Sequence, residues 1–186
     1  MVDLNKIVPS LLFDLKYCTK NNFTGVKLYP NITTTYLRRD AAAALQKVVI
    51  FLQQQGVGLK IFDAYRPYSV TKLMWNMIHD ERYVANPLNG SGHNKGIAVD
   101  LTLINRSTAL QLDMGTGFDN FTDSAHHDFT KKLPSQIIAN RELLKTTMEK
   151  FGFKSLATEW WHYSFISTEI FDVLDIGFKT FQKKIR

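Results

Sequence analysis

The sequence predicts an α+β domain in which helices pack against a small antiparallel sheet. Two kinds of pattern lead to this fold class. Short segments alternate between apolar and polar residues or are rich in strand-forming residues, and longer segments repeat apolar residues at helical spacing. The strands are short and the helical crossovers are few, which favours antiparallel pairing. With 186 residues, 45% of them hydrophobic, and no linker-like stretch, residues 1–186 are expected to form one domain.

The first half of the chain predicts a helix, a strand and a second helix. Residues 39–55 repeat apolar side chains at helical spacing, and Gly56 follows as a stop signal. Residues 57–63 alternate well enough to form a strand. Pro67 then suits the first turn of a second helix, over about residues 68–79, because that turn needs no N–H from proline.

The second half of the chain predicts a loop, two strands and a third helix. Residues 84–96 are rich in Asn, Gly and Ser, which is typical of a loop. Residues 97–103 alternate strictly, so their strand holds Asp100 on the face opposite its large apolar side chains. Residues 136–151 have helical spacing, and residues 160–166 have strong strand propensity.

The chain is basic, with a formal net charge of +6. Such a charge would fit an anionic partner, for example nucleic acid or a cell-wall polymer. The basic residues are scattered, however, and the densest group of them, Lys183, Lys184 and Arg186, lies at the end of the chain. We therefore interpret the charge as that of a solvated surface, and expect no nucleic-acid partner.

Cys18 is the only cysteine, so an internal disulfide and a cysteine-based zinc site are both excluded. Residues 1–17 have an acidic residue before their first lysine and a broken apolar run, unlike a signal peptide. No apolar run is long enough for a transmembrane helix. These features predict a cytoplasmic protein without a membrane partner, or a periplasmic one if a signal peptide is removed before this numbering.

Two histidines and one aspartate form a candidate zinc site. His93 lies in the glycine-rich segment and precedes Asp100 by seven residues, so a loop residue and a strand residue can converge on one point. His162 is the third candidate ligand, and its alternative is a histidine of the core. Imidazole and carboxylate both suit zinc, and three protein ligands leave one position open for water. An open position is typical of a catalytic rather than a structural zinc site.

Glu159 and Arg66 supply two further groups that a zinc hydrolase needs. Residues three apart on a regular strand point to opposite faces, so we expect Glu159 on the turn before the strand of His162, as a general base beside the metal. Arg66 lies at a strand-to-helix junction, and its permanent charge can stabilise an oxyanion. The alternatives are a surface carboxylate for Glu159 and a salt bridge to Asp63 for Arg66.

Five segments of the chain resemble motifs of a known family: DLKYCTKNNFTG, DAYRP, SGHNKGIAVDLTL, MGTGFD and EWWHY. The chain resembles the D-alanyl-D-alanine dipeptidases of the vancomycin-resistance type. These are zinc peptidases related to the D-Ala-D-Ala carboxypeptidases and to the hedgehog signalling domain, and the resemblance spans nearly the whole chain. It implies the fold of that group and one zinc ion per chain. The residues implied for zinc binding, general base catalysis and transition-state stabilisation are those above: His93, Asp100 and His162, then Glu159, then Arg66.

The resemblance also implies substrate contacts that spacing alone does not single out. Tyr17 and Asp119 match the ammonium-binding positions, and Ser91 matches a contact on the carboxylate side. The implied reaction is hydrolysis of a small D,D-dipeptide, free D-alanyl-D-alanine, to two D-alanines by a zinc-activated water.

The chain differs from the family in one segment, and two alternative functions remain open. The segment between Pro67 and Ser91 is shorter than in the vancomycin-resistance enzymes, which predicts a more open pocket and less strict selectivity. One alternative is a related peptidoglycan carboxypeptidase or endopeptidase that acts on longer stem peptides. The other is a non-catalytic binding module that carries zinc. The sequence predicts no oligomeric state.

Overall fold

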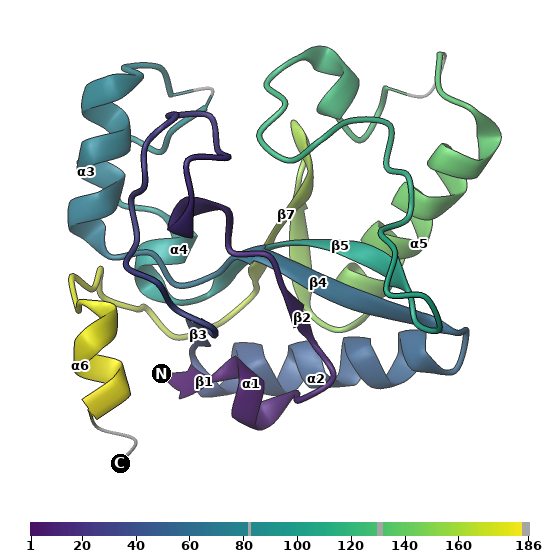
Figure 1. Cartoon of the computed structure of the whole chain (residues 1–186), viewed down its shortest axis with the longest axis horizontal. Helices are drawn as coiled ribbons and strands as arrows, with labels where there is room; N and C mark the ends of the chain where they lie inside the picture. The colour runs from purple at the N-terminus through teal and green to yellow at the C-terminus, as the bar shows by residue number, and fades with distance from the viewer. Residues whose placement is uncertain (82, 130–131, 184–186) are drawn as a thin grey trace.

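A computed structural model of the chain describes residues 1–81, 83–129 and 132–183. Its centre is a five-stranded sheet with the strand order β2-β4-β5-β7-β6 (Figure 1). The strands are β2 (Leu12–Phe13), β4 (Val57–Asp63), β5 (Ala98–Asn105), β6 (Phe153–Leu156) and β7 (Glu159–Phe165). Neighbouring strands are antiparallel except β2 and β4, which pair in parallel. The predicted α+β class is confirmed, with one parallel pair at the edge of an otherwise antiparallel sheet.

Two long helices, α2 (Arg39–Gln53) and α5 (Ser135–Lys150), pack against each other and against this sheet. The buried side of α2 carries Leu45, Val48 and Leu52, none of which is exposed to solvent. These residues recur every three or four positions, so one stripe of the helix faces the core. The main hydrophobic core therefore lies between the sheet and the helix pair.

Shorter elements complete the chain. The remaining helices are α1 (Leu4–Ile7), α3 (Tyr68–Met77), α4 (Gly92–Lys95) and α6 (Phe178–Lys183), with the 3-10 turns η1 (Lys16–Cys18) and η2 (Asp123–Ala125). Strands β1 (Val2–Asp3) and β3 (Tyr36–Leu37) form a separate antiparallel pair. Helices α3, α4 and α6 gather at one side of the molecule (Figure 1). A second cluster of buried residues, rich in tyrosine, lies among these short elements.

Each predicted helix and strand is present, and its ends differ from the prediction by at most two residues. The loop predicted over residues 84–96 is wrong at its end, where α4 forms one helical turn. Ser91 caps this turn, and Gly96 ends it in a left-handed conformation with φ of 73°. A helix of four residues is too short to show the apolar periodicity from which longer helices are predicted.

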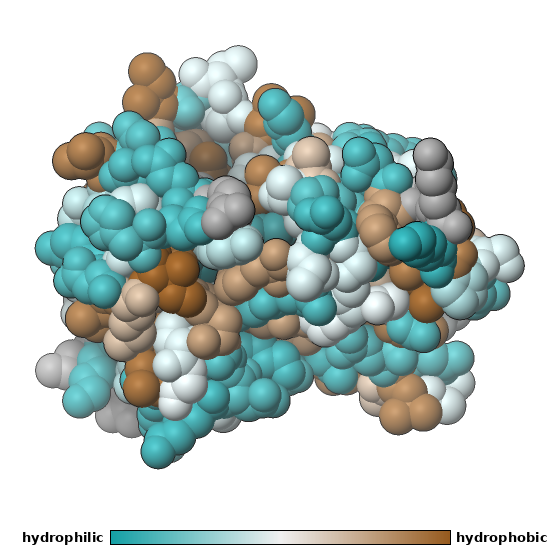
Figure 2. Space-filling view, turned by 90° about the horizontal axis from the view of Figure 1, so that it is seen from above, coloured by the Kyte–Doolittle hydropathy of each residue, from teal (hydrophilic) through white to brown (hydrophobic). Residues whose placement is uncertain are grey.

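The surface seen from above carries hydrophilic residues with hydrophobic ones scattered among them (Figure 2). Within the part of the chain that the structure describes, no helix is long and apolar enough to cross a membrane. Of the predicted basic tail, Lys184 and Arg186 lie outside the described residues.

Candidate active site

The register of two central strands brings the first two candidate ligands together. Asp100 of β5 and His162 of β7 are direct partners in the antiparallel ladder. Side chains of directly paired residues stand side by side on the same face of a sheet. His162 Nδ1 and Asp100 Oδ1 are accordingly 2.9 Å apart.

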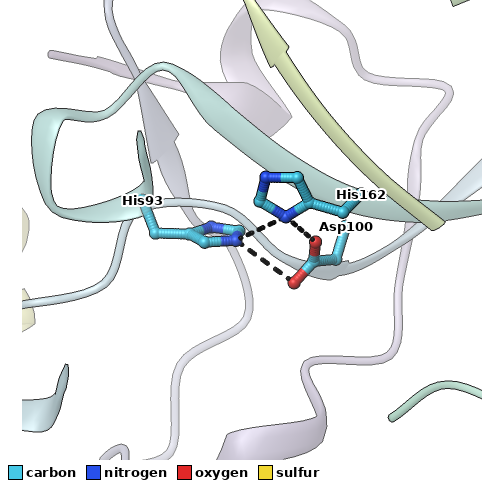
Figure 3. Close-up of side chains that lie close together, drawn as sticks. All are labelled: His93, Asp100 and His162. Atoms are coloured by element: carbon cyan, nitrogen blue, oxygen red, sulfur yellow. Dashed lines mark hydrogen bonds and ion pairs between the residues drawn. The ribbon is translucent and has the colours of Figure 1, made fainter. Parts of the chain in front are cut away.

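His93 reaches the same point from α4 (Figure 3). Its Nε2 atom lies 3.2 Å from His162 Nδ1 and 3.3 Å from Asp100 Oδ2. One donor atom from each residue lies within 4.8 Å of the other two. Donors about 2 Å from a shared tetrahedral zinc ion are roughly 3.3 Å apart, so this donor set fits zinc in both chemistry and spacing.

In each imidazole, the nitrogen that points away from the candidate zinc position has a hydrogen-bond partner that orients the ring. His93 Nδ1 lies 2.6 Å from the carbonyl oxygen of Ala64, which can only accept, so Nδ1 carries the proton. His162 Nε2 lies 3.3 Å from Ser164 Oγ and can donate to it. Both rings can therefore direct an unprotonated nitrogen at the same point, as metal-binding histidines do.

The charge state of Asp100 suits a ligand. Burial alone would raise its pKa, but the neighbouring imidazoles of His93 and His162 outweigh burial and lower the pKa below its usual range. Asp100 is therefore a carboxylate at neutral pH.

Glu159 is the first residue of β7 rather than a residue of the turn before it, so that detail of the prediction is wrong. Its Oε2 atom nevertheless lies 4.0 Å from His162 Nδ1. The pairing of β6 with β7 shifts register between Ser155 and Leu156, and such an irregularity changes which way nearby side chains point. Burial raises the pKa of Glu159 to about 7. A carboxyl group with this pKa can both accept and donate a proton near neutral pH.

Arg66 forms the alternative salt bridge and still faces the site. Its Nε and Nη2 atoms donate to Asp63 Oδ2 at 3.0 and 2.8 Å. The same guanidinium lies 3.9 Å from Asp100 Oδ2 and stacks over the Tyr17 ring, 5.2 Å from its centroid. Asp63 also accepts a hydrogen bond of 2.9 Å from the hydroxyl of Tyr29. The salt bridge therefore holds the guanidinium in place beside the candidate metal ligands.

Tyr17 and Asp119 meet on another side of the site although 102 residues separate them. The Tyr17 hydroxyl lies 3.2 and 3.3 Å from the two carboxylate oxygens of Asp119. Asp119 has a φ of 58°, a left-handed conformation that is uncommon for a residue other than glycine. Burial, together with the charges of Asp100 and Glu159, raises the pKa of Asp119 well above its usual range. A positive charge that arrives beside Asp119 would therefore favour its ionised form.

One cavity of about 550 Å³ joins these groups. All eight predicted site residues line it: Tyr17, Arg66, Ser91, His93, Asp100, Asp119, Glu159 and His162. The predicted carboxylate-side contact, Ser91, is half-buried at the start of α4. The sequence did not single out several other lining residues, among them Phe23, Phe121 and His126. Nothing in their local pattern marks them, because they reach the cavity from irregular segments.

Comparison with known proteins places the chain in a family. Residues 1–184 match the family model described as D-ala-D-ala dipeptidase. The chain belongs to this family. It is 35% identical over 181 residues to the D-alanyl-D-alanine dipeptidase of Escherichia coli (strain K12). This alignment covers 97% of this chain and 92% of that protein. It is 32% identical to the enzyme of the same name from Streptomyces coelicolor, over 87% of this chain and 89% of that one.

A solved structure of the vancomycin resistance D,D-pentapeptidase VanY with Zn(II) aligns with 70% of this chain and 73% of that one, at 16% identity and a TM-score of 0.44. Membership of the D-ala-D-ala dipeptidase family confirms the resemblance found in the five motifs. It also confirms that the chain is an enzyme of the peptidase class. The individual roles of the eight site residues stay predictions.

Proposed function

We propose that this protein hydrolyses free D-alanyl-D-alanine to two D-alanines with one zinc ion per chain. The observation that carries this proposal is the cavity itself, in which three metal donors converge beside a carboxyl group and a guanidinium. Relatives that match nearly the whole chain are named D-alanyl-D-alanine dipeptidase, which supports the choice of substrate.

In this proposal His93, Asp100 and His162 hold the zinc ion. When bound there, zinc supplies Lewis acidity, which polarises a carbonyl group and makes water more acidic. Three protein ligands leave a coordination position for a reactant.

Glu159 acts as the general base in this proposal. Its carboxylate takes a proton from the water that attacks the peptide carbonyl, and then delivers a proton to the amine that leaves. The pKa of about 7 in the metal-free protein reflects its burial, and a nearby cation would lower that value. The position of Oε2, 4.0 Å from Nδ1 of the proposed ligand His162, supports this role.

Arg66 stabilises the negative charge that develops on the carbonyl oxygen. A guanidinium that Asp63 already holds in place needs little reorganisation when this charge appears. Arg66 also keeps its proton, because Asp63 and the other nearby acidic groups raise its pKa further despite its burial.

Asp119 and Tyr17 select the free amino terminus of the substrate. The ammonium of the dipeptide supplies the positive charge that the buried carboxylate of Asp119 lacks. A peptide with a blocked amino terminus would leave this carboxylate unpaired, and a buried polar group without a partner lowers affinity. Ser91 would contact the carboxylate end.

The size of the cavity favours a second candidate, a peptidase that acts on longer stem peptides. A volume of about 550 Å³ would hold a ligand larger than two alanines. The non-catalytic alternative explains less, because pure zinc binding needs neither Glu159 nor Arg66 in this position.

The test uses zinc-loaded protein with free D-Ala-D-Ala and with its N-acetylated counterpart, and measures released D-alanine. Release from the free dipeptide alone supports the proposal and the role of Asp119. Release from the blocked substrate alone assigns the protein to the longer stem peptides. No release from either substrate, with zinc bound, favours an endopeptidase or a binding module.

We also propose a cytoplasmic location, where this hydrolysis would remove a cell-wall precursor. In the periplasm the same reaction would recover released dipeptide. Cell fractionation followed by detection of the chain distinguishes the two locations.

A further inference from the structure

Asn94, next to His93 in α4, has an amide side chain whose donors and acceptor are all used. The residue is fully buried. Its Nδ2 atom donates to the carbonyl oxygen of Arg66 and to Thr71 Oγ1, both at 2.9 Å. Its Oδ1 atom accepts from the backbone N–H of Ser91 at 3.0 Å. An asparagine side chain has two N–H donors and one oxygen acceptor, so each of these groups forms a hydrogen bond here.

These bonds link two segments that each carry a predicted catalytic group. The backbone N–H of Arg66 donates to the carbonyl oxygen of His93 at 3.2 Å, and its carbonyl oxygen accepts from Asn94. Both backbone polar groups of Arg66 are therefore held by the pair His93–Asn94. The His93 ring adds a third link, because its Nδ1 donates to the carbonyl oxygen of Ala64.

Helix α4 cannot hold this arrangement by itself. It has four residues, and an isolated helical turn is unstable because nucleation fixes several residues for few hydrogen bonds. The glycines on either side, Gly90 and Gly96, have φ angles of 64° and 73°, so the flanking backbone adds little restraint of its own. The position of His93 relative to Arg66 therefore depends on the links between the segments.

We propose that Asn94 is a positioning residue of the peptidase reaction, which sets the position of Arg66 relative to the metal ligand His93. Asn94 touches neither substrate nor metal in this proposal. It acts through the backbone of Arg66 and through the turn that carries His93. The proposal rests on the proposed function for its catalytic readout, but its effect on zinc binding can be measured separately.

The test is Asn94→Ala, assayed at saturating zinc with free D-Ala-D-Ala. A shift of about 1 Å in a catalytic group can cost about 100-fold in rate, and loss of a supporting contact typically costs 10–100-fold. We expect kcat to fall about 10–100-fold while KM stays within about threefold. We also expect zinc affinity, measured by competition with a chromophoric chelator, to weaken about tenfold because the turn of His93 is loosened.

Asn140→Ala is the matched control. Asn140 is also a buried asparagine, 7% exposed, and its Nδ2 donates to the carbonyl oxygen of Asp113 at 2.8 Å. It lies in α5, which contributes no residue to the cavity. This variant should lower Tm but keep kcat and zinc affinity within about twofold of wild type. If Asn94→Ala shows only this loss of Tm, its role is structural and the proposal is overturned.

A double-mutant cycle identifies the residue through which Asn94 acts. In an Arg66→Ala background, Asn94→Ala should lower kcat by less than about twofold, because there is no guanidinium left to misplace. A full loss in that background overturns the proposal. If Asn94→Ala does not fold, Asn94→Ser replaces it in the same comparisons, since a hydroxyl keeps one donor but is too short to bond both acceptors.

A failure of the proposed dipeptidase function can be distinguished from a failure of the proposal for Asn94. Wild-type protein that binds zinc but does not hydrolyse the dipeptide contradicts the proposed function. The chelator competition then still tests Asn94, and equal zinc affinity in wild type, Asn94→Ala and Asn140→Ala overturns the present proposal.

Discussion

Asp100 and His162 face each other across two paired strands, whereas Tyr17 and Asp119 meet only through their side chains. The first pair is placed by a backbone ladder in the middle of the sheet. The second pair joins a 3-10 turn to an irregular segment with a left-handed residue. We infer that the metal side of the cavity is the rigid part of the site, and that the substrate side depends on contacts between distant segments.

The two buried aspartates of these pairs also differ in charge environment. The pKa of Asp100 is lowered because two imidazoles outweigh its burial. The pKa of Asp119 is raised because burial and the charges of two other carboxyl groups outweigh the opposing effects of Arg66 and of the hydrogen bond from Tyr17. In the proposed function, the same residue type would therefore act as a charged metal ligand on one side of the cavity and as a partner for the substrate ammonium on the other.

The largest effect is expected on the metal side. Asp100→Ala should lose stoichiometric zinc and all measurable hydrolysis, because only two of the three proposed protein ligands remain. Zinc content after dialysis, measured by atomic absorption, checks this. Asp14→Ala, which removes a surface ion pair with Lys16, should keep both properties. Full zinc retention in Asp100→Ala would remove Asp100 from the ligand set.

The next prediction distinguishes zinc binding from catalysis. Glu159→Gln should retain zinc but lower kcat by about 10²–10⁴-fold, since proton transfer by a positioned side chain contributes about that much. Zinc content and kcat are measured on the same sample. A variant with the wild-type kcat would show that another group is the base.

A smaller effect is expected on the substrate side. Asp119→Ala should raise KM for the free dipeptide about 10–100-fold and leave zinc content unchanged, because an ammonium loses its charged partner. Tyr17→Phe keeps the ring and removes only the hydroxyl, so its rise in KM should be smaller. Equal KM values in wild type and Asp119→Ala would remove Asp119 from the substrate site.

The smallest effect concerns stability of the metal-free protein. The pKa of Glu159 rises from its ordinary value of 4.5 to about 7 on folding, so its protonated form stabilises the fold. This contribution is complete below pH 4.5 and is lost as the pH rises to about 7. It amounts to at most about 3 kcal/mol.

Thermal unfolding between these pH values measures the change. Glu159→Gln cannot ionise, so its Tm should fall less than that of wild type over the same range. Parallel profiles in the two proteins would contradict the raised pKa of Glu159.

The regular elements were predictable because their patterns are local. The strand at residues 57–63 is β4, and the strict alternation around Asp100 is β5. The one-turn helix α4 escaped prediction because its asparagine, glycine and serine content is that of a loop. Its capping box, in which Ser91 and Asn94 bond each other's backbone, is the local signal that identifies it.

The site was predictable only in part. His93, Asp100, His162, Glu159 and Arg66 could be chosen for their chemistry and their setting in the chain. Tyr17 and Asp119 could not, because a lone tyrosine and a lone aspartate in irregular segments carry no signal of their own. The resemblance to a family singled them out, and the structure then brought them within hydrogen-bonding distance.

The sequence by itself determined which side chains are available and which segments form helices and strands, since propensity and periodicity act over a few residues. The tertiary structure alone decided that these side chains meet in one cavity. Asp100 faces His162 through strand register, and a slip of one residue would turn either side chain to the other face. Asp119 faces Tyr17 across 102 residues of chain. Such contacts depend on how the whole chain packs, which no local pattern records.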